Sequence, residues 1–437
     1  MDPQDFNEKR VLVMGLGLSG GGVGVVKFLA KNGARLMVMD LKTRRELAPA
    51  LEELKDLVVK YIFGKNPLRV LKKTDLLIVN PAVDLRSKFV MAARKKKIPI
   101  DSELGIFLKL CPAKLVAVTG TKGKSTVSRL IYETLKSAGR HVFWGGNIGI
   151  SLLDRLHEMT PDSYVVLEIS SFQLDLFRQS NLAFAPHIAV LTNIFPDHLD
   201  RYNSFHDYKE SKLSLFTHQT RHDYAVVPSA LRRILKKTKS RPIGFQPTLP
   251  GFIPQERIKI IGDHNKENIS AALAVARILK IDPAVARRTV IEFGGLEHRL
   301  EFLRYIRGVR FYNDSASTTP TSTVYAIQSF KRPVLLIAGG LNKGLPLTEL
   351  ARAIAKKTKG AYLVGKNANE IKRMAKRLNP TLHLEHCDSL RQAVKNAFKA
   401  ADIDDTILLS PGCASFDMFA NAKERGKEFK RIVENLK

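Results

Sequence analysis

The chain has 437 residues, of which 44% are hydrophobic, and its formal net charge is +29. This length allows roughly two to four domains with a well-buried core, and the composition is that of a globular protein. Three widely spaced cysteines without a CxxC pair argue against a disulfide framework or a zinc site, and fit a reducing cytoplasm. No apolar stretch approaches the roughly 18 residues of a membrane helix, and the polar start MDPQDFNEKR is not a signal peptide.

The excess of basic residues is compatible with nucleic acid, an anionic membrane surface or small polyanionic substrates as partners. Basic clusters occur at 94–97, 232–237 and 356–357. Aromatic residues do not interleave with them, so we interpret most of these clusters as solvated faces rather than a nucleic-acid patch.

The first hundred residues have the pattern of a nucleotide-binding unit. Residues 11–14 predict a strand, the letters GLGLSG and a helix follow, and a second strand at 36–39 ends at Asp40. This is GxGxxG in a βαβ unit, with an acidic residue twenty positions after Gly20. The pattern suggests that Asp40 contacts a ribose; the competing interpretation is a strand-end cap.

A second glycine loop lies near the start of the next domain. An apolar run at 115–118 predicts a buried strand, and apolar residues at helical spacing occupy 127–135. Between them stands TGTKGKST, at 119–126. The usual phosphate loop needs a glycine where Val118 stands, so this is a shortened variant. The competing interpretation is a glycine-rich turn with a helix cap.

The residue types of this loop suit phosphate binding. Backbone N–H groups and a helix N-terminus attract anions, and Gly120 and Gly123 allow the backbone to approach closely. Lys124 is placed to reach the outer phosphates, and Ser125 or Thr126 can ligate Mg²⁺.

Further apolar stretches end in polar residues. Strands predicted at 142–144, 164–167 and 187–191 are followed by GGNIG, EISSFQ and TNIFPDHLD. Ligands bind where parallel strands end, so these residues point to one shared site. Glu168 suits Mg²⁺, whereas His198 has a competing interpretation as a satisfied structural histidine.

Three polar residues further along the chain have less specific patterns. Lys212 lies on a predicted helix, YKESKL, where an isolated lysine is normally solvated. Asn265 and Asn268 share a helix face and can read the edge of adenine, although a helix cap by Asn265 is the competing interpretation. The letters EHRLE at 297–301 predict a hinge.

The remaining sequence repeats the pattern of strands that end in polar residues. Strands are predicted at 309–312, 334–337 and 406–409, with helices at 349–356 and 390–400 between them. We therefore expect an α/β protein with another doubly wound domain at its end. The predicted domains are a Rossmann-like N-terminal domain at 1–102, a central P-loop-type ATPase domain with a mostly parallel sheet at 103–296, and a C-terminal Rossmann-like domain at 297–437.

In this order the motifs resemble the Mur ligase family over nearly the whole chain. They are TGTKGKST, GGNIG, LEISSFQL, TNIFPDHLDRY, YKESK, GDHNKEN, EHRLE, NDS, AGGLNKG and LLSPGCASFDMF. Length and the GLGLSG start are most similar to the members that add D-glutamate. The resemblance implies a cytoplasmic, monomeric, ATP-dependent amide ligase of peptidoglycan synthesis, which joins UDP-N-acetylmuramoyl-L-alanine and D-glutamate through an acyl phosphate. GxGxxG would then hold the uridine diphosphate substrate rather than a redox cofactor.

The resemblance also implies roles for individual residues. The catalytic residues are Lys124, Glu168, His198 and Lys212. The ATP-binding residues are Gly120, Thr121, Lys122, Gly123, Lys124, Ser125, Thr126, Asn265, Asn268, Arg299 and Asp314. The UDP-substrate residues are Leu18, Ser19, Asp40, Lys42, Asn80, Asn147, Ser170 and Gln173. The D-glutamate residues are Thr318, Lys343 and Ser415. Two Mg²⁺ ions would be held by Ser125, Thr126, Glu168, His198 and, once carbamylated, Lys212.

Three departures from the family pattern concern the amino-acid substrate. Ala316 stands where relatives often have lysine, and Ala422 where they often have a phenylalanine that closes over the amino acid. Asn80-Pro81-Ala82 replaces a usual Ser-Pro-Gly. A related ligase for a different amino acid, a basic NTP-binding nucleic-acid protein and a GxGxxG dehydrogenase are the alternatives.

Overall fold

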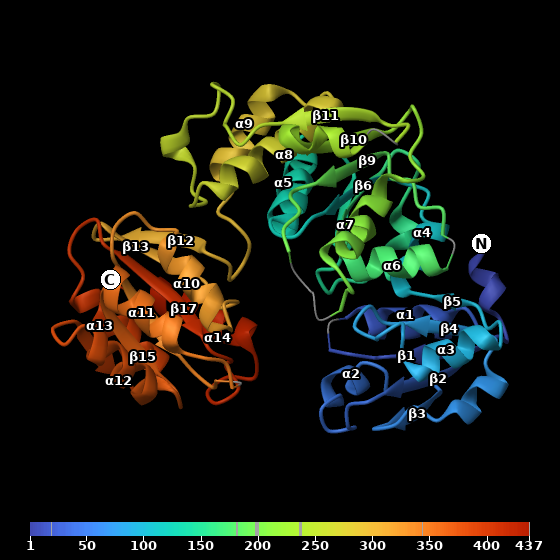
Figure 1. Cartoon of the computed structure of the whole chain (residues 1–437), viewed down its shortest axis with the longest axis horizontal. Helices are drawn as coiled ribbons and strands as arrows, with labels where there is room; N and C mark the ends of the chain where they lie inside the picture. The colour runs from blue at the N-terminus through green and yellow to red at the C-terminus, as the bar shows by residue number, and fades with distance from the viewer. Residues whose placement is uncertain (19, 181, 197–200, 236–237, 343, 437) are drawn as a thin grey trace. The chain divides into compact units, whose positions relative to one another are not determined.

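The computed structural model describes residues 1–18, 20–180, 182–196, 201–235, 238–342 and 344–436. The chain forms a three-domain α/β fold with three sheets (Figure 1). Its residues make two compact units, 1–250 with 266–289, and 251–265 with 290–437. The first unit holds two of the sheets and the second unit holds the third. The domain limits expected at 102 and 296 stay a prediction.

The first sheet is five-stranded and parallel, in the order β3-β2-β1-β4-β5. Its strands are β1 (Arg10–Met14), β2 (Arg35–Asp40), β3 (Val59–Phe63), β4 (Leu76–Val79) and β5 (Ile100–Asp101). The helices of this region are α1 (Gly21–Lys31), α2 (Ala48–Glu52), α3 (Lys88–Lys95) and α4 (Glu103–Leu110). Residues of α1 and α4 share one buried cluster and residues of α3 another, so the sheet is covered on both faces.

The second sheet is six-stranded and parallel, in the order β11-β10-β9-β6-β8-β7. Its strands are β6 (Lys114–Thr119), β7 (Val142–Gly146), β8 (Tyr164–Glu168), β9 (Ile188–Leu191), β10 (Tyr224–Pro228) and β11 (Arg241–Phe245). The helices are α5 (Lys124–Ser137), α6 (Ser171–Gln179), α7 (Phe205–Leu213), α8 (His264–Ile278) and α9 (Pro283–Glu292). β6 lies between β8 and β9, so the loops after these three strands gather at one edge.

The third sheet has the order β12-β13-β17-β14-β15-β16, and only its edge strand β12 is antiparallel. Its strands are β12 (Glu301–Ile306), β13 (Val309–Asn313), β14 (Val334–Gly339), β15 (Thr358–Val364), β16 (His383–His386) and β17 (Thr406–Gly412). The helices are α10 (Pro320–Gln328), α11 (Thr348–Lys357), α12 (Ala368–Leu378), α13 (Leu390–Lys399) and α14 (Ala422–Glu434). α10, α11 and α12 share one buried cluster and α13 and α14 another, which confirms a doubly wound domain.

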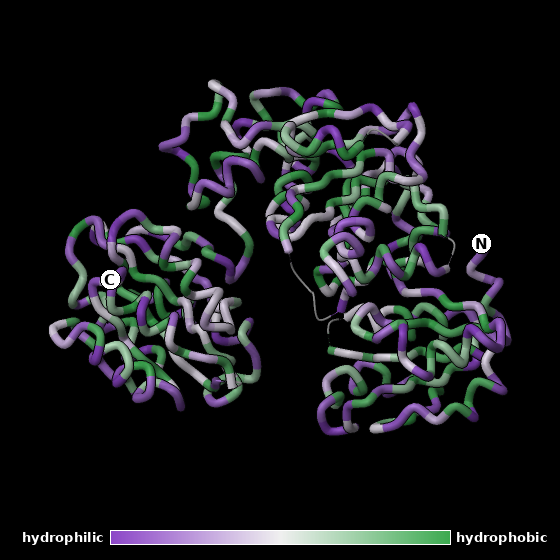
Figure 2. The backbone as a smooth tube through the Cα atoms, in the orientation of Figure 1, coloured by the Kyte–Doolittle hydropathy of each residue, from purple (hydrophilic) through white to green (hydrophobic). Residues whose placement is uncertain are grey.

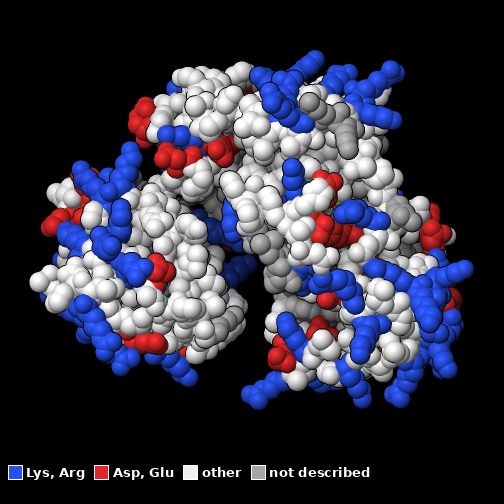
Figure 3. All heavy atoms as spheres, viewed as in Figure 1, with Lys and Arg blue, Asp and Glu red and all other residues white. Residues whose placement is uncertain are grey.

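Hydrophobic residues concentrate along the strands, as parallel sheets buried on both faces require (Figure 2). Short 3-10 helices complete the described elements: η1 (Pro3–Phe6), η2 (Leu68–Lys73), η3 (Leu153–Glu158), η4 (Ser214–Phe216), η5 (Ser229–Leu235) and η6 (Gln255–Arg257). In the described part of the chain, none of the helices is both long enough and apolar enough to span a bilayer. Lys and Arg side chains are spread over much of the visible surface, with smaller groups of Asp and Glu (Figure 3).

Candidate active site

The predicted phosphate loop connects β6 to α5 and has two glycines in backbone conformations that other residues avoid. Gly120 has φ +148° and Gly123 has φ +81°. A Cβ on Gly120 would lie 1.9 Å from Oγ1 of Thr192, and one on Gly123 would lie 2.3 Å from Oδ1 of Asn268. Both positions therefore require glycine, first because the backbone there has positive φ, and second because neighbouring side chains approach too closely for a Cβ.

The end of the neighbouring strand β9 holds the backbone of this loop. Oγ1 of Thr192 donates to the carbonyl oxygen of Lys122 across 2.6 Å. The N–H of Lys122 donates to Oδ1 of Asn193 at 2.9 Å, and the N–H of Thr121 to the Asn193 carbonyl at 3.0 Å. The sequence showed Thr192 and Asn193 at a strand end but suggested no role for them.

Two lysine side chains converge on the carbonyl oxygen of Gly120. Nζ of Lys124 donates to it across 3.0 Å and to the Thr121 carbonyl across 3.0 Å. Nζ of Lys212, from α7, donates to the Gly120 carbonyl across 2.8 Å. The structure therefore brings both predicted catalytic lysines to the phosphate loop.

The local sequence predicted a solvated Lys212, and this prediction is wrong, because Lys212 is 2% exposed. α7 packs its face with Tyr208, Ser211 and Lys212 inward, and Oγ of Ser211 donates to the Ser171 carbonyl at 3.0 Å. The Lys212 ammonium lies 4.6 Å from the centre of the Tyr208 ring. The Tyr208 hydroxyl donates to Oγ1 of Thr121 at 3.1 Å. Tyr208 and Lys212, on the same face of α7, therefore each donate a hydrogen bond to the phosphate loop.

Glu168, at the end of β8, faces the N-terminus of α5. Its carboxylate accepts hydrogen bonds from Oγ of Ser125 and, at 2.9 Å, from Nδ2 of Asn147. A buried carboxylate beside a serine hydroxyl is an oxygen donor set that suits Mg²⁺. Thr126 is partly buried on the same helix turn, and His198 lies outside the described residues. Among described residues, no group of three His, Cys, Asp or Glu side chains could hold a metal ion.

The predicted uridine site surrounds the first glycine loop. Oδ2 of Asp40 accepts the N–H of Gly17 at 3.1 Å, and Oδ1 accepts the N–H of Lys42 at 2.9 Å. Asn80 packs on the same loop, because a Cβ on Gly15 would lie 2.9 Å from the Asn80 Cβ. Leu18 is exposed here. Asp40 thus orders the loop as a strand-end cap; its contact with a ribose stays a prediction, and Ser19 lies outside the described residues.

The remaining predicted UDP-substrate residues stand at strand ends of the second sheet. Ser170 and Gln173 form a capping box at the start of α6, in which the Ser170 N–H donates to Oε1 of Gln173 at 2.9 Å. A Cβ on Gly20 would lie 2.4 Å from the Gly149 carbonyl oxygen, so the first glycine loop abuts the loop that contains Asn147. The first unit therefore brings both groups of residues together.

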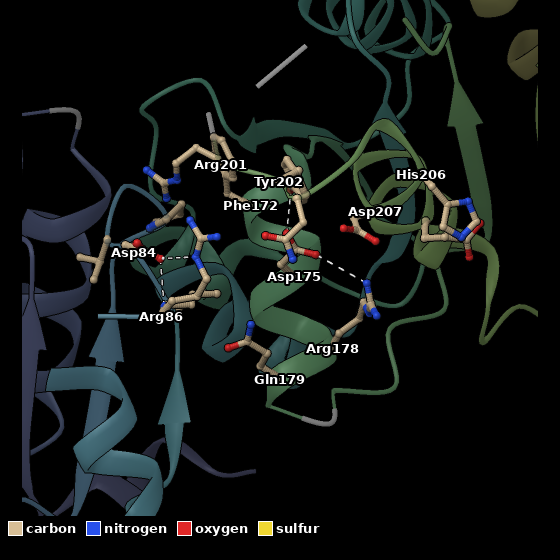
Figure 4. A pocket seen from close by; sticks show the side chains of 15 residues that line it. Asp84, Arg86, Phe172, Asp175, Arg178, Gln179, Arg201, Tyr202, His206 and Asp207 are labelled. Carbon is tan, nitrogen blue, oxygen red and sulfur yellow. Dashed lines mark hydrogen bonds and ion pairs between the residues drawn. The ribbon is translucent and has the colours of Figure 1, made fainter. Parts of the chain in front are cut away.

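A cavity of about 420 Å³ lies in the first unit between residues 81–86 and helices α6 and α7 (Figure 4). Its wall includes the stacked rings of Phe172 and Tyr202, whose centres are 6.1 Å apart. The Arg201 guanidinium lies 4.7 Å from the Phe172 ring centre, and the Tyr202 hydroxyl donates to Asp175 at 2.7 Å. Phe172 stands between the capping-box residues in the sequence and Pro81 follows Asn80, so the cavity adjoins two segments that carry predicted UDP-substrate residues.

The two predicted adenine-contacting amides lie on α8 and have different surroundings. Asn268 is buried against Gly123 of the phosphate loop. Nδ2 of Asn265 donates to the Ile261 carbonyl at 2.6 Å, and its N–H to the Gly262 carbonyl at 3.0 Å. Asn265 therefore holds the segment before the helix, as a residue near a helix start often does.

The second unit places Asp314 at the end of β13. Asp314 is 4% exposed; its Oδ2 accepts from Oγ of Ser410 at 2.7 Å and its Oδ1 from the N–H of Leu300 at 3.1 Å. Burial raises the pKa of Asp314 to about 6. Arg299 is exposed on the chain that precedes β12.

The predicted amino-acid residues stand at the ends of neighbouring strands of the third sheet. Thr318 is partly buried after β13, and Ser415 is buried after β17. The N–H of Gly412 donates to the carbonyl of Ser317 at 2.9 Å, which joins these two loops. Lys343, expected after β14, lies outside the described residues.

Sequence comparisons match three family models to the chain in the same order as the sheets. The MurD-like N-terminal domain of Mur ligases matches residues 9–102, the Mur ligase middle domain matches 118–248, and the Mur ligase glutamate ligase domain matches 298–413. A UDP-N-acetylmuramoylalanine–D-glutamate ligase of Caldanaerobacter subterraneus is 37% identical, over 99% of this chain and 100% of that protein. The chain belongs to the Mur ligase family.

Solved structures agree with this fold at low sequence identity. The UDP-N-acetylmuramate-alanine ligase of Thermotoga maritima is 18% identical, with a TM-score of 0.59 over 98% of this chain and 100% of that one. The MurF ligase of Thermotoga maritima, in complex with ADP, is 17% identical, with a TM-score of 0.55 over 99% and 97% of the two chains. These likenesses confirm the Mur ligase fold that the sequence motifs predicted.

Proposed function

We propose that this Mur ligase is the ATP-dependent enzyme that adds D-glutamate to UDP-N-acetylmuramoyl-L-alanine. The observation that carries the proposal is the phosphate loop with two lysines on the Gly120 carbonyl and the Glu168–Ser125 pair beside it. Relatives such as the Symbiobacterium thermophilum ligase, 34% identical over 98% of both chains, bear the name of this activity. We also propose that the enzyme is cytoplasmic and monomeric.

In the proposed reaction, a carboxylate oxygen of the UDP-linked alanine takes the γ-phosphoryl group of ATP, and ADP leaves. The amine of D-glutamate then attacks the acyl phosphate, loses a proton, and expels inorganic phosphate to leave an amide. The protein's task is to neutralise charge around the phosphoryl group and to position two anionic reactants. Lys124 supplies a positive charge to the β- and γ-phosphates, and the loop N–H groups bind the phosphate oxygens.

The residues present fit Mg²⁺, which supplies charge neutralisation when bound. Glu168, Ser125 and Thr126 are the described oxygen donors for it, and His198 and carbamylated Lys212 complete the proposed set for two ions. Carbamylation would convert the Lys212 ammonium into a carboxylate at the end of the same side chain, with one N–H left for the Gly120 carbonyl. Asn147 orients the Glu168 carboxylate through their 2.9 Å hydrogen bond.

The remaining assignments follow the family pattern onto residues at strand ends. Leu18, Ser19, Asp40 and Lys42 hold the uridine diphosphate, with Asn80, Asn147, Ser170 and Gln173 toward the sugar. Asn265, Asn268, Arg299 and Asp314 contact ATP. Thr318, Lys343 and Ser415 receive the carboxylates of D-glutamate, since hydroxyls and a cation suit that task.

A coupled assay of ADP release tests the proposal on the full chain. We expect ADP only when ATP, Mg²⁺, UDP-N-acetylmuramoyl-L-alanine and D-glutamate are all present. Absence of turnover with this set, under conditions where the chain is folded, would overturn it. The same assay with a panel of amino acids tests the second candidate, a Mur ligase for a different amino acid, which is considered because Ala316 and Ala422 depart from the family pattern.

A further inference from the structure

A buried arginine with no part in the proposed chemistry lies beneath the candidate amino-acid site. Arg425, on α14, is 2% exposed, and its guanidinium donates hydrogen bonds to two loops. Nε donates to Oγ of Ser315 at 3.1 Å and Nη2 to the Ser315 carbonyl at 3.1 Å. Nη1 and Nη2 each donate to the Cys413 carbonyl at 3.2 Å. One planar fork thus joins the loop after β13 to the loop after β17.

A third loop meets the other two at the same place. Leu341, after β14, exchanges backbone hydrogen bonds of 2.9 and 3.0 Å with Ala414, which follows Cys413. A Cβ on Gly340 would lie 2.4 Å from the Ala414 carbonyl oxygen and 3.4 Å from Nη1 of Arg425. Arg425 therefore underlies the three loops that carry the proposed amino-acid residues, including Ser415.

The charge of Arg425 has no acidic neighbour at ion-pair distance. Within the described ranges of the chain, no carboxylate oxygen comes within 4.0 Å of the guanidinium, and all its acceptors are neutral carbonyl or hydroxyl oxygens. Burial lowers the pKa of Arg425 to about 10, although the fields of Cys413 and Asp417 act in the opposite direction. Buried charges in proteins are normally paired. Arg425 differs from this norm, because its hydrogen bonds go to neutral groups and the one acidic side chain whose field favours its charged form, Asp417, does not pair with it directly.

We propose that Arg425 is a positioning residue for the amino-acid substrate, and that the carboxylates of that substrate bring negative charge toward a buried guanidinium that has no direct carboxylate partner among the described residues. Arg425 does not touch the substrate. It fixes the loops that present Thr318 and Ser415, and its field through those loops favours a dianionic amino acid over a neutral one. This inference rests on the proposed function, because it assumes that the amino acid binds at these loops.

Steady-state kinetics of Arg425→Met and Arg425→Lys in the full chain test the proposal. We expect Arg425→Met to raise KM for the amino acid about tenfold or more, while KM for ATP changes by less than about twofold. We expect Arg425→Lys, which keeps the charge but not the fork, to recover a substantial part of that loss. Arg431→Met is the matched control, since Arg431 is an exposed arginine of the same helix, paired with Glu428.

Failure of the proposed role of Arg425 can be distinguished from failure of the proposed function. Wild-type turnover identifies the amino acid, and the variants are measured with whichever acceptor the wild type uses. Equal changes in KM for ATP and for the amino acid, or a lysine variant no better than methionine, would overturn the proposal. So would loss of the folded state in both variants by circular dichroism, because the arginine would then serve stability rather than the substrate.

Discussion

The ammonium group of Lys212 donates a hydrogen bond to the carbonyl oxygen of Gly120 across 2.8 Å, although 92 positions separate the two residues. Lys124 donates to the same oxygen from within the loop. One backbone oxygen of the loop thus accepts from two lysines that are far apart in the sequence. Both ammonium groups therefore lie at the loop for which we propose phosphate binding, and Lys212 is the one for which we propose conversion to a carbamate.

The first prediction concerns Lys212. With ¹³C-labelled bicarbonate, we expect a carbamate carbon signal in the NMR spectrum of the wild type that is absent from Lys212→Met. We also expect Lys212→Met to lose activity by about a hundredfold or more, since a charge at the phosphoryl site is lost. Lys209→Met, at a partly exposed position of the same helix, is the control. A variant without the signal but with full activity would contradict a catalytic carbamate.

The second prediction concerns Lys124, whose Nζ is bonded to the loop carbonyls of Gly120 and Thr121. Lys124→Ala should lower kcat/KM for ATP by roughly a thousandfold, because phosphoryl transfer depends on charge neutralisation by groups held in place. Circular dichroism and thermal unfolding should show a folded protein. Lys136→Ala, an exposed lysine on the same helix, should behave as the wild type. Full ATP turnover by Lys124→Ala would remove the basis of the proposed function.

Most strands were predictable because each is a short apolar run bounded by polar residues. The run at 164–167 is extended by one residue in β8, and the run at 115–118 is extended by one residue at each end in β6. Parallel sheets buried on both faces produce such runs, so the strand ends, and with them the candidate site, could be located from the sequence. Several edge and outer strands were not expected, namely β3, β5, β10, β11, β12, β15 and β16. The antiparallel strand β12 follows directly on the segment interpreted as a hinge.

The burial of Lys212 and Arg425 could not be predicted, because it depends on which helix faces pack against other parts of the fold. Lys212 has the local sequence of a solvated residue, and only the packing of α7 against α6 and the phosphate loop makes it buried. Arg425 is likewise an ordinary residue of an amphipathic, highly charged helix until α14 places it under three loops. Pairings of this kind join residues far apart in the chain, and local periodicity carries no information about them.

The third prediction separates backbone strain from crowding in the phosphate loop. Gly123 (φ +81°) and Gly139 (φ +71°) stand at opposite ends of α5, but a Cβ meets Asn268 at Gly123 and open space at Gly139. Gly139→Ala should cost about 1–2 kcal/mol of unfolding free energy through its left-handed backbone alone, with KM for ATP unchanged. Gly123→Ala should cost at least as much and also raise KM for ATP about tenfold, because Asn268 and the loop must move.

Urea unfolding and ATP kinetics of the two glycine variants provide the comparison. The contrary result is an unchanged KM for ATP in Gly123→Ala, which would mean that the Asn268 side chain yields without disturbing the loop.

The fourth prediction concerns the pH dependence caused by Asp314, whose pKa burial raises from 3.8 to about 6. The folded state binds this proton more tightly than the unfolded state, so the contribution of Asp314 to stability is present below about pH 4 and is lost as the pH rises to 6. The carboxylate form, which we propose accepts hydrogen bonds from ATP, is instead formed as the pH rises through 6. The affinity for ATP and this part of the stability should therefore change in opposite directions.

Asp314→Asn should flatten both pH profiles, because it keeps the shape of the side chain but does not titrate. Asp388→Asn, at an exposed position of the same unit, should leave them as in the wild type. KM for ATP and urea midpoints between pH 5 and 8 are the measurements. An ATP profile that is unaltered in Asp314→Asn would exclude this residue from the nucleotide site.

The last prediction distinguishes two roles of Asn147. The family pattern assigns Asn147 to the UDP-sugar, whereas in the structure its Nδ2 donates to the carboxylate of Glu168 at 2.9 Å. If its main role is to orient Glu168, Asn147→Ala should raise the Mg²⁺ concentration for half-maximal rate about tenfold or more, as loss of a residue behind a metal ligand commonly does. KM for the UDP-substrate should then stay near the wild-type value. Asn32→Ala removes a comparable amide hydrogen bond, of 2.8 Å to the Phe28 carbonyl, at the end of α1 and serves as the control. A raised KM for the UDP-substrate at an unchanged Mg²⁺ requirement would instead assign Asn147 to the sugar alone.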